Sequence, residues 1–155
     1  MSVKVLVTGS DGFVGSHVVE ELVNRGYAVT AMVQYDSRGS EGWMADLDKK
    51  IRLEVRVVHG DIRDRDLVGS LIRGQDAVLH LAALIAIPYS YRAPASYIQT
   101  NIVGTLNVLE AAKSSDIRRL IHTSTSEVYG SAQYVPIDEK HPLVGQSPYS
   151  ASKIG

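Results

Sequence analysis

Cysteine is absent from this 155-residue chain. The chain therefore forms no disulfide and offers no thiolate to a metal ion. It also lacks an excess of charge, because 16 Lys and Arg residues stand against 17 Asp and Glu residues, with a formal net charge of -1. Without a strong field of one sign, a chain has little attraction for a polyanion. We expect neither a nucleic acid nor an anionic membrane among its partners.

Long hydrophobic runs are missing as well. The longest apolar stretch, Ala77 to Ile87, is interrupted by His80 and is shorter than the ~20 residues that a membrane helix needs. The first residues carry neither the apolar core of a signal peptide nor an Arg-rich transit pattern. These absences predict a cytoplasmic protein.

Strand and helix patterns alternate along the chain. Hydrophobic residues make up 45% of it, enough for the core of one globular domain. The predicted strands are Val3–Thr8, Ala28–Val33, Leu53–His59, Ala77–Leu81 and Arg119–Ser124. Three helices are predicted. The first begins after residue 13, the second spans Arg65–Arg73 and the third spans Ala95–Lys113, with apolar positions at Ile98, Ile102, Leu106 and Leu109. Residues 34–50 are polar and predict a surface loop with one helical turn. The alternation predicts an α/β fold, a doubly wound parallel sheet (Rossmann fold), as one domain over residues 1–155.

The first strand runs into a glycine-rich turn. Gly9, Gly12 and Gly15 stand three residues apart, directly before an amphipathic helix. This spacing allows a tight turn, the approach of a pyrophosphate and close packing of helix on sheet, with the helix N-terminus facing the negative charge. We therefore expect a dinucleotide contact from the glycines and from Asp11, Phe13 and Val14, against the alternative of a purely structural turn.

Cofactor type stays open at the end of the second strand. An acidic residue there would bind a ribose 2′-hydroxyl, whereas an arginine would accommodate a 2′-phosphate. The strand ends near Val33, the next acid is Asp36, and Ser37 and Arg38 follow. The cofactor is thus NAD or NADP, and Arg38 can equally be a solvated loop cation.

Two further strand ends offer cofactor contacts. The Asp61 carboxylate, followed by Ile62, can accept a hydrogen bond from an adenine amine, or it can cap the next helix. The fourth strand ends in Leu81, Ala82 and Ala83, where small residues permit a flat ligand to approach or simply pack well.

Tyr149 and Lys153 stand at positions i and i+4 near the C-terminus, so a helix places them on one face. A free tyrosine has a pKa of ~10, and a nearby ammonium stabilises the phenolate. The pair therefore suits a general base, although at this spacing it can also be plain helix surface. The segment from Thr123 to Gly130, at the end of the fifth strand, adds hydroxyls and a carboxylate that can bind a sugar, whereas Thr123 and Ser124 can also serve a turn.

Together these residues resemble the extended short-chain dehydrogenase/reductase family, over essentially the whole chain. The motifs are T-G-x-x-G-x-x-G at Thr8, G-D at Gly60, the helical Asn101 and Y-x-x-x-K at Tyr149. Within that family, S-T-S-E-V-Y-G from Ser124 is similar to GDP-mannose 4,6-dehydratases, and the wider sequence resembles N-acetylhexosamine 4,6-dehydratases.

The resemblance implies a nucleotide-sugar substrate and a hydride cycle. Tyr149 removes the 4-hydroxyl proton while Thr125 binds that hydroxyl, Glu127 takes the C5 proton, water leaves C6, and hydride returns to C6. Lys153 assists Tyr149 and holds the ribose, and Asn101 joins the cofactor contacts. Ser126 stands where dTDP-glucose dehydratases carry an Asp. The expected sugar pocket contains Ile85, Pro88, Tyr89, Tyr91 and Ser124.

Family members are about twice as long, so the resemblance implies an N-terminal part that ends within the catalytic helix and has little activity alone. It also implies a homodimer for the full-length form. The alternatives are a C4 epimerase, which needs no base for C5, and a non-catalytic dinucleotide-binding module.

Overall fold

The computed structural model describes residues 2–155, which form two compact units. The sheet unit comprises the residues up to Ala82 together with Gly104–Thr123, and the helical unit comprises Ala83–Val103 together with Ser124–Gly155. No helix within residues 2–155 is long and apolar enough to cross a membrane. Each unit is described by itself below.

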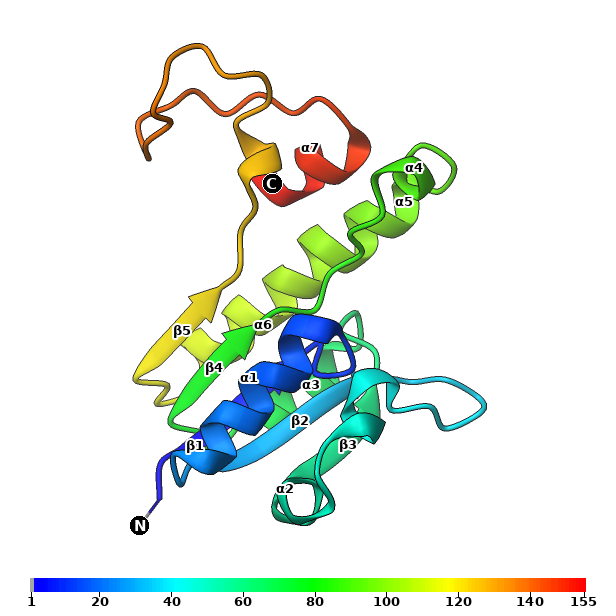
Figure 1. Ribbon diagram of the computed structural model, residues 1–155, viewed down its shortest axis with the longest axis vertical. Helices are drawn as coiled ribbons and strands as arrows, with labels where there is room; N and C mark the ends of the chain where they lie inside the picture. Colours follow the sequence, from blue (N-terminus) through cyan, green and yellow to red (C-terminus); the bar gives the residue numbers. More distant parts are fainter. Residues whose placement is uncertain (1) are drawn as a thin grey trace. The chain divides into compact units, whose positions relative to one another are not determined.

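The sheet unit contains five parallel strands in the order β3-β2-β1-β4-β5 (Figure 1). They are β1 (Lys4–Thr8), β2 (Ala28–Gln34), β3 (Arg56–Gly60), β4 (Ala77–His80) and β5 (Arg119–His122). β1 pairs with β2 on one side and with β4 on the other, and its end residue Thr8 lies opposite both Met32 and His80. The predicted doubly wound parallel sheet is confirmed, and its strand order reverses between β1 and β4.

Both faces of the sheet are covered, because neighbouring strand residues point to opposite sides. The helices of this unit are α1 (Phe13–Asn24), α2 (Lys49–Glu54), α3 (Arg65–Ile72) and α6 (Gly104–Lys113). In Figure 1, α1 lies in front of the sheet and α3 and α6 lie behind it. Val5 and Val7 belong to the apolar cluster on the α1 face, whereas Leu6, fully buried between them, belongs to the cluster of α3 and α6. Burying such a side chain contributes about 1.5–3 kcal/mol.

The predicted third strand is wrong at its start. Leu53 lies in the last turn of helix α2 and is 86% exposed, and the strand begins only at Arg56. Asp48 begins this helix by accepting a hydrogen bond from the backbone of Lys50, and Arg52 forms a two-pronged ion pair with Glu41 at 2.6 and 2.8 Å. The helix depends on a partner eleven residues away, which strand propensity alone does not reveal.

The predicted surface loop also contains a buried anchor. A 3-10 turn, η1 (Gly42–Asp46), carries Met44, which is completely buried in the core of the α1 face. Residues 34–50 are therefore only partly a loop.

The predicted helix from Ala95 to Lys113 is present but interrupted. Its parts are α5 (Pro94–Tyr97), a π-helical segment η2 (Ile98–Val103) and α6. The apolar positions that indicate the helix are not its buried ones, since Ile98, Leu106 and Leu109 are 42–52% exposed. The buried residues are Tyr97, Asn101, Gly104, Asn107 and Val108. A wider π turn shifts the inward-facing positions away from the 3.6-residue period.

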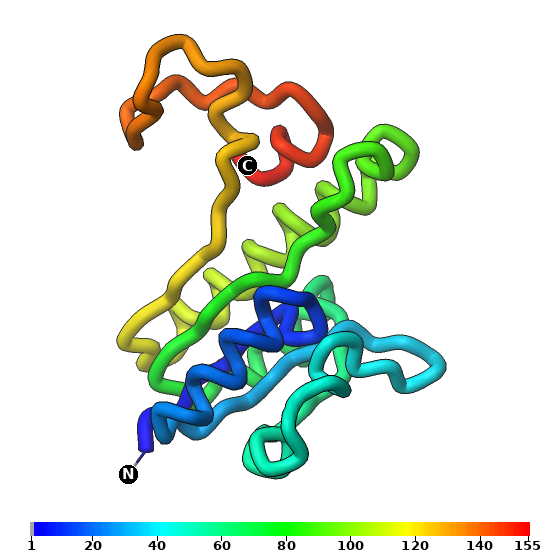
Figure 2. The backbone as a smooth tube through the Cα atoms, viewed as in Figure 1, coloured from blue at the N-terminus to red at the C-terminus, as the bar shows by residue number. Residues whose placement is uncertain are grey.

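The helical unit consists of short segments and a long loop. Its remaining elements are α4 (Ile87–Ser90), the 3-10 turn η3 (Ser126–Val128) and α7 (Pro148–Ile154). Residues 131–146 contain no helix or strand and form the long orange loop of the tube in Figure 2. This loop is closed by a hydrogen bond from the backbone of Val144 to that of Val128 (2.9 Å) and contains His141, which is 2% exposed and accepts a hydrogen bond from the backbone of Gln133.

Two helical glycines differ sharply in their surroundings and provide a test of this packing. A Cβ at Gly15 in α1 would overlap the Gly9 carbonyl oxygen, whereas a Cβ at Gly69 in α3 meets nothing within 4 Å. We expect Gly15→Ala to lower the free energy of unfolding by about 1–3 kcal/mol through overpacking. We expect Gly69→Ala to raise it by about 0.5–1 kcal/mol, because alanine loses less chain entropy. Urea denaturation checks both, and an equal effect of the two substitutions would contradict the packing described here.

Candidate functional site

The glycine-rich turn follows the end of β1 and lies within the sheet unit. Gly9 has a φ of +71°, and a Cβ at this residue would lie 2.7 Å from the backbone nitrogen of Ala82. Gly15 is packed against the carbonyl of Gly9. These two glycines are therefore required by the packing of the chain itself.

Gly12 is different, because nothing in the protein requires a glycine there. It begins α1 with φ -78° and ψ 163°, an extended conformation that any residue adopts. Among residues 2–155, the only atom within 4 Å of a Cβ at Gly12 would be the Gly9 oxygen at 3.4 Å. The first N–H groups of a helix have no partner within the helix and attract anions. The missing side chain thus leaves open space in front of a helix N-terminus.

A neighbouring segment supports this turn. The backbone of Trp43 in η1 donates to the carbonyl of Asp11 at 3.0 Å, and the Trp43 ring meets the ring of Phe13 edge-on, 5.3 Å between centroids. Phe13 and Val14 are each 58% exposed at the start of α1. The sequence analysis did not predict a role for Trp43. The one feature that could have indicated it is that Trp43 is the single tryptophan of the chain.

The segment after β2 forms a turn that is held by Asp36. Asp36 accepts hydrogen bonds from the backbones of Arg38 (side-chain oxygen, 2.6 Å) and Gly39 (carbonyl, 2.9 Å). The Arg38 side chain is 88% exposed, and its Nε lies 3.7 Å from the Asp36 carboxylate. Ser37 lies between them. The Arg38 guanidinium is therefore available to a phosphate as well as to solvent.

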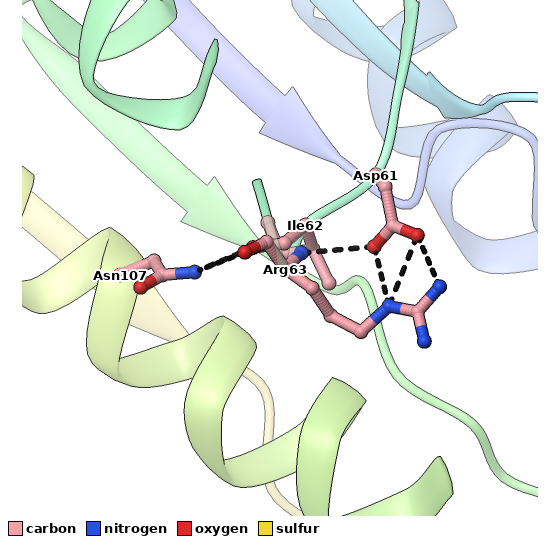
Figure 3. A network of polar contacts seen from close by, with 4 residues as sticks. All are labelled: Asp61, Ile62, Arg63 and Asn107. Carbon is pink, nitrogen blue, oxygen red and sulfur yellow. Dashed lines mark hydrogen bonds and ion pairs between the residues drawn. The ribbon is translucent and has the colours of Figure 1, made fainter. Parts of the chain in front are cut away.

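Asp61 is held by Arg63 at the end of β3 (Figure 3). The Asp61 carboxylate accepts from the backbone and from the guanidinium of Arg63, and these hydrogen bonds hold its pKa below the usual range. The alternative interpretation of Asp61 as a helix cap is wrong, because Asp64 caps α3 by accepting from the backbones of Asp66 and Leu67.

Ile62 and Asn107 fix the backbone beside that carboxylate. The amide of Asn107 donates to the carbonyls of Ile62 (3.1 Å) and Arg63 (3.0 Å), as Figure 3 shows for the first of these. A Cβ at Gly104 would lie 2.7 Å from the Ile62 side chain, so α6 packs closely on it. The predicted adenine contacts therefore stand on a rigid support within the sheet unit.

The exit of β4 lies against the exit of β1. The backbone of Leu81 donates to the Thr8 carbonyl, and that of Ala82 donates to the Thr8 hydroxyl, both at 3.2 Å. The crevice at such a switch of strand order is where open α/β sheets bind ligands. The sequence placed Leu81 and Ala82 correctly at this edge of the sheet, although β4 ends one residue earlier than predicted.

Tyr149 and Lys153 both belong to α7, in the helical unit. Ser147 caps this helix by accepting from the backbone of Ser150, and Pro148 occupies its first turn. Tyr149 is 7% exposed, with its ring edge-on to that of Tyr97 at 6.3 Å. Burial lowers the pKa of the Lys153 ammonium. A partly desolvated cation one helical turn from a phenol is suited to proton transfer.

Asn101 connects helix α7 to the segment that follows Ala83. Its side chain pairs with both backbone groups of Leu84, at 2.8 and 3.0 Å, and donates to the Ser152 hydroxyl at 2.9 Å. Ser152 in turn donates to the carbonyl of Tyr149 at 2.7 Å. Asn101 thus orients protein groups, and its predicted cofactor contact stays a prediction.

The hydroxyl-rich patch surrounds η3. Thr125 caps this turn by accepting from the backbone of Glu127 at 3.3 Å, and the turn is anchored by buried Val128. Ser124, Ser126 and Glu127 are exposed. The predicted sugar-lining residues Ile85, Pro88 and Tyr89 are also exposed in this unit. Over residues 2–155, no group of three His, Asp or Glu side chains is placed to hold a metal ion.

Comparison with known proteins identifies the family. The model of the GDP-mannose 4,6 dehydratase family matches residues 6–155. The chain belongs to this family. The match confirms the resemblance to the nucleotide-sugar dehydratases and epimerases among the extended short-chain dehydrogenases/reductases.

Individual relatives include both kinds of enzyme. The chain is 39% identical to a dTDP-glucose 4,6-dehydratase of an Actinoplanes species (98% of this chain, 49% of the relative) and 35% identical to the mouse UDP-glucose 4-epimerase (97% and 46%). The chain spans about half the length of the curated relatives it matches.

Solved structures of this family share the fold. The dTDP-glucose 4,6-dehydratase from Streptomyces venezuelae, solved with NAD and TYD bound, matches at a TM-score of 0.87 and 37% identity (99% of this chain, 49% of that one). A UDP-N-acetylglucosamine 4-epimerase from Methanobrevibacter ruminantium matches at 0.87 and 34% (99% and 48%).

The Asp61–Arg63 pair gives a titration that tests the adenine side of the site. The pKa of Asp61 is lower in the folded than in the unfolded chain, so the ion pair stabilises the fold at pH values above the unfolded-state pKa. This stabilisation is lost as the pH falls through the folded-state pKa. Because the Asp61 side chain is 37% exposed, the contribution is small, about 0–1 kcal/mol. We expect Arg63→Gln to raise the pKa of Asp61, because the hydrogen bonds from the guanidinium that lower it are lost, and carboxyl NMR measures the change. The control Arg65→Gln removes a nearby charge without removing a ligand of Asp61, and an equal shift in both variants would argue against the specific pair.

Proposed function

We propose that this chain carries the cofactor-binding and proton-transfer residues of an NAD(P)-dependent nucleotide-sugar 4,6-dehydratase. The observation that supports it most is the family match over residues 6–155 together with the exposed Glu127, which an epimerisation at C4 does not require. The wider alternatives are a C4 epimerase, favoured by the epimerases among the relatives, and a non-catalytic binding module.

The sheet unit supplies the nucleotide-binding half of this proposal. The open space at Gly12, the exposed start of α1 and the helix N-terminus suit a pyrophosphate. Asp61 and Ile62 would contact the adenine, and Leu81, Ala82 and Ala83 would leave room for flat rings. The side chain of Arg38 can turn toward a 2′-phosphate, and Ser37 toward a 2′-hydroxyl, so the cofactor is NAD or NADP.

Removing the open space at Gly12 tests this half directly. We expect Gly12→Ala to fold normally, because its backbone is ordinary and a Cβ meets no protein atom closer than 3.4 Å. It should nevertheless weaken NAD or NADP binding by at least about tenfold, since a methyl group would displace the pyrophosphate from the helix N-terminus. Calorimetric titration of the 155-residue chain measures this, with Gly69→Ala as control. Unchanged affinity in Gly12→Ala would contradict a pyrophosphate at this turn.

The helical unit supplies the proton chemistry. NAD or NADP, when bound, would supply the hydride acceptor for the sugar and the hydride that is returned to it. Tyr149 takes the proton of the 4-hydroxyl, to which the Thr125 hydroxyl is hydrogen-bonded, while the Lys153 ammonium stabilises the resulting phenolate and binds the ribose. Glu127 takes the C5 proton, and the C6 hydroxyl leaves as water after receiving a proton from Glu127, which would thus serve both steps. Ile85, Pro88, Tyr89 and Ser124 would line the sugar, and Asn101 would add a contact on the cofactor side.

Mass spectrometry of sugar nucleotides separates the three candidate functions. We expect a panel of UDP-, GDP- and dTDP-hexoses, incubated with a form extended to the length of the relatives, to contain one that loses the mass of one water. Conversion without a change in mass would indicate the epimerase, and cofactor binding without conversion would leave the binding module.

Two substitutions in the same assay separate the chemical steps. Tyr149→Phe removes the first base, so it should abolish all conversion. Glu127→Gln should lower dehydration by at least about a hundredfold while hydride transfer to the cofactor still occurs, which absorbance of the reduced nicotinamide reports. Glu139→Gln, an exposed acid of the same unit, serves as control. Full dehydratase activity in Glu127→Gln would contradict the role of this carboxylate.

Assembly and location extend the same proposal. Leu106 and Leu109 on α6 are 52% and 48% exposed, which supports an apolar contact in a homodimer of the longer form. The expected cytoplasmic location and the absence of nucleic-acid and membrane partners stay predictions from the sequence.

A further inference from the structure

A buried polar chain occupies the switch of strand order in the sheet unit. Thr8 and His80 are the last residues of β1 and β4, where they lie opposite each other in the parallel register. Thr8 is 0% and His80 1% exposed. Buried polar side chains are unfavourable unless they are hydrogen-bonded, so each contact they make has a specific geometry.

The contacts run from the backbone of Ala82 to helix α6. The Ala82 N–H donates to the Thr8 hydroxyl at 3.2 Å, that hydroxyl lies 2.8 Å from His80 Nδ1, and His80 Nε2 lies 2.9 Å from the Thr105 hydroxyl. Three side chains and one backbone group are thereby linked in series.

A neutral His80 with its proton on Nε2 fits these contacts. Ala82 donates into the Thr8 oxygen, which leaves the Thr8 hydroxyl proton to be donated to His80 Nδ1. The neutral imidazole then carries its own proton on Nε2 and donates it to the Thr105 oxygen. In this arrangement His80 orients the Thr8 hydroxyl so that its lone pairs face Ala82.

We propose that Thr8 and His80 are positioning residues for the dinucleotide, an inference that rests on the proposed function. The bond between Thr8 and Ala82 lies immediately beside Gly9, whose Cα approaches Ala82 so closely that a Cβ would lie 2.8 Å from the Ala82 Cα. A shift of Ala82 therefore changes the width of the crevice next to the glycine-rich turn. Apolar residues would fill these positions, but they would not fix Ala82.

The test compares cofactor affinity with stability in the 155-residue chain. Thr8→Val keeps the shape and removes the hydroxyl, and we expect it to weaken the binding of NAD or NADP by about fivefold or more. Thr8→Ser keeps the hydroxyl and should bind within about twofold of the wild type. Thr30→Val is the matched control, because Thr30 is a threonine of β2 that is 6% exposed and accepts from the Gln75 amide. It should leave the affinity unchanged.

A second pair of variants addresses His80 even if Thr8→Val does not fold. His80→Asn places an amide near the position of Nδ1 and preserves an acceptor for Thr8, whereas His80→Gln reaches toward Thr105 and loses that acceptor. We expect the glutamine variant to bind NAD or NADP more weakly than the asparagine variant at equal melting temperature.

The outcomes are distinct. A wild-type chain that binds neither NAD nor NADP would overturn the proposed function itself. Binding by the wild type with equal affinity in Thr8→Val, or in the folded His80→Gln, would overturn only the positioning role. Equal weakening by Thr30→Val would also overturn it, because the effect would then follow from general destabilisation.

Discussion

The sheet unit depends on a close approach of three backbone segments at one point. Gly9 lies against Ala82 on one side, and Gly15 lies against Gly9 on the other. No side chain fits between them, so the exit of β1, the exit of β4 and the first turn of α1 are fixed relative to one another by backbone contact. Backbone atoms cannot move aside as a flexible side chain can, and this rigidity gives the crevice a defined width.

The surroundings of that point are arranged to preserve it. η1 holds Asp11 from one side through Trp43, and Thr8 holds Ala82 from the other. Ile62 is fixed in a similar way. The Asn107 amide donates to its carbonyl, and Gly104 lets α6 pack closely on its side chain because Gly104 has no side chain. The residues expected to touch a ligand are therefore supported by others, of which Trp43 and Asn107 lie outside the sequence motifs.

The helical unit uses a different physical device. It has few buried aliphatic residues, and its segments are held by directional polar contacts: Asn101 on Leu84 and Ser152, and the Tyr97 hydroxyl on the carbonyl of Ala86 at 2.6 Å. Hydrogen bonds depend on distance and angle, whereas apolar contacts tolerate sliding. A unit that must place Tyr149 and Lys153 for proton transfer gains from such directionality.

The sequence by itself determined the doubly wound parallel sheet, the glycine-rich turn and the helix that carries Tyr149 and Lys153 at positions i and i+4. These follow from local rules: β-branched runs, glycine spacing and the separation of i and i+4. Only the tertiary structure decided that Gly12 faces open space while Gly9 and Gly15 are packed. It also decided that Asp64 rather than Asp61 caps α3 and that Asn101 faces inward while Leu106 does not. The partners of Asn101 lie 17 and 51 residues away along the chain, and hydrophobic periodicity contains no information about such partners.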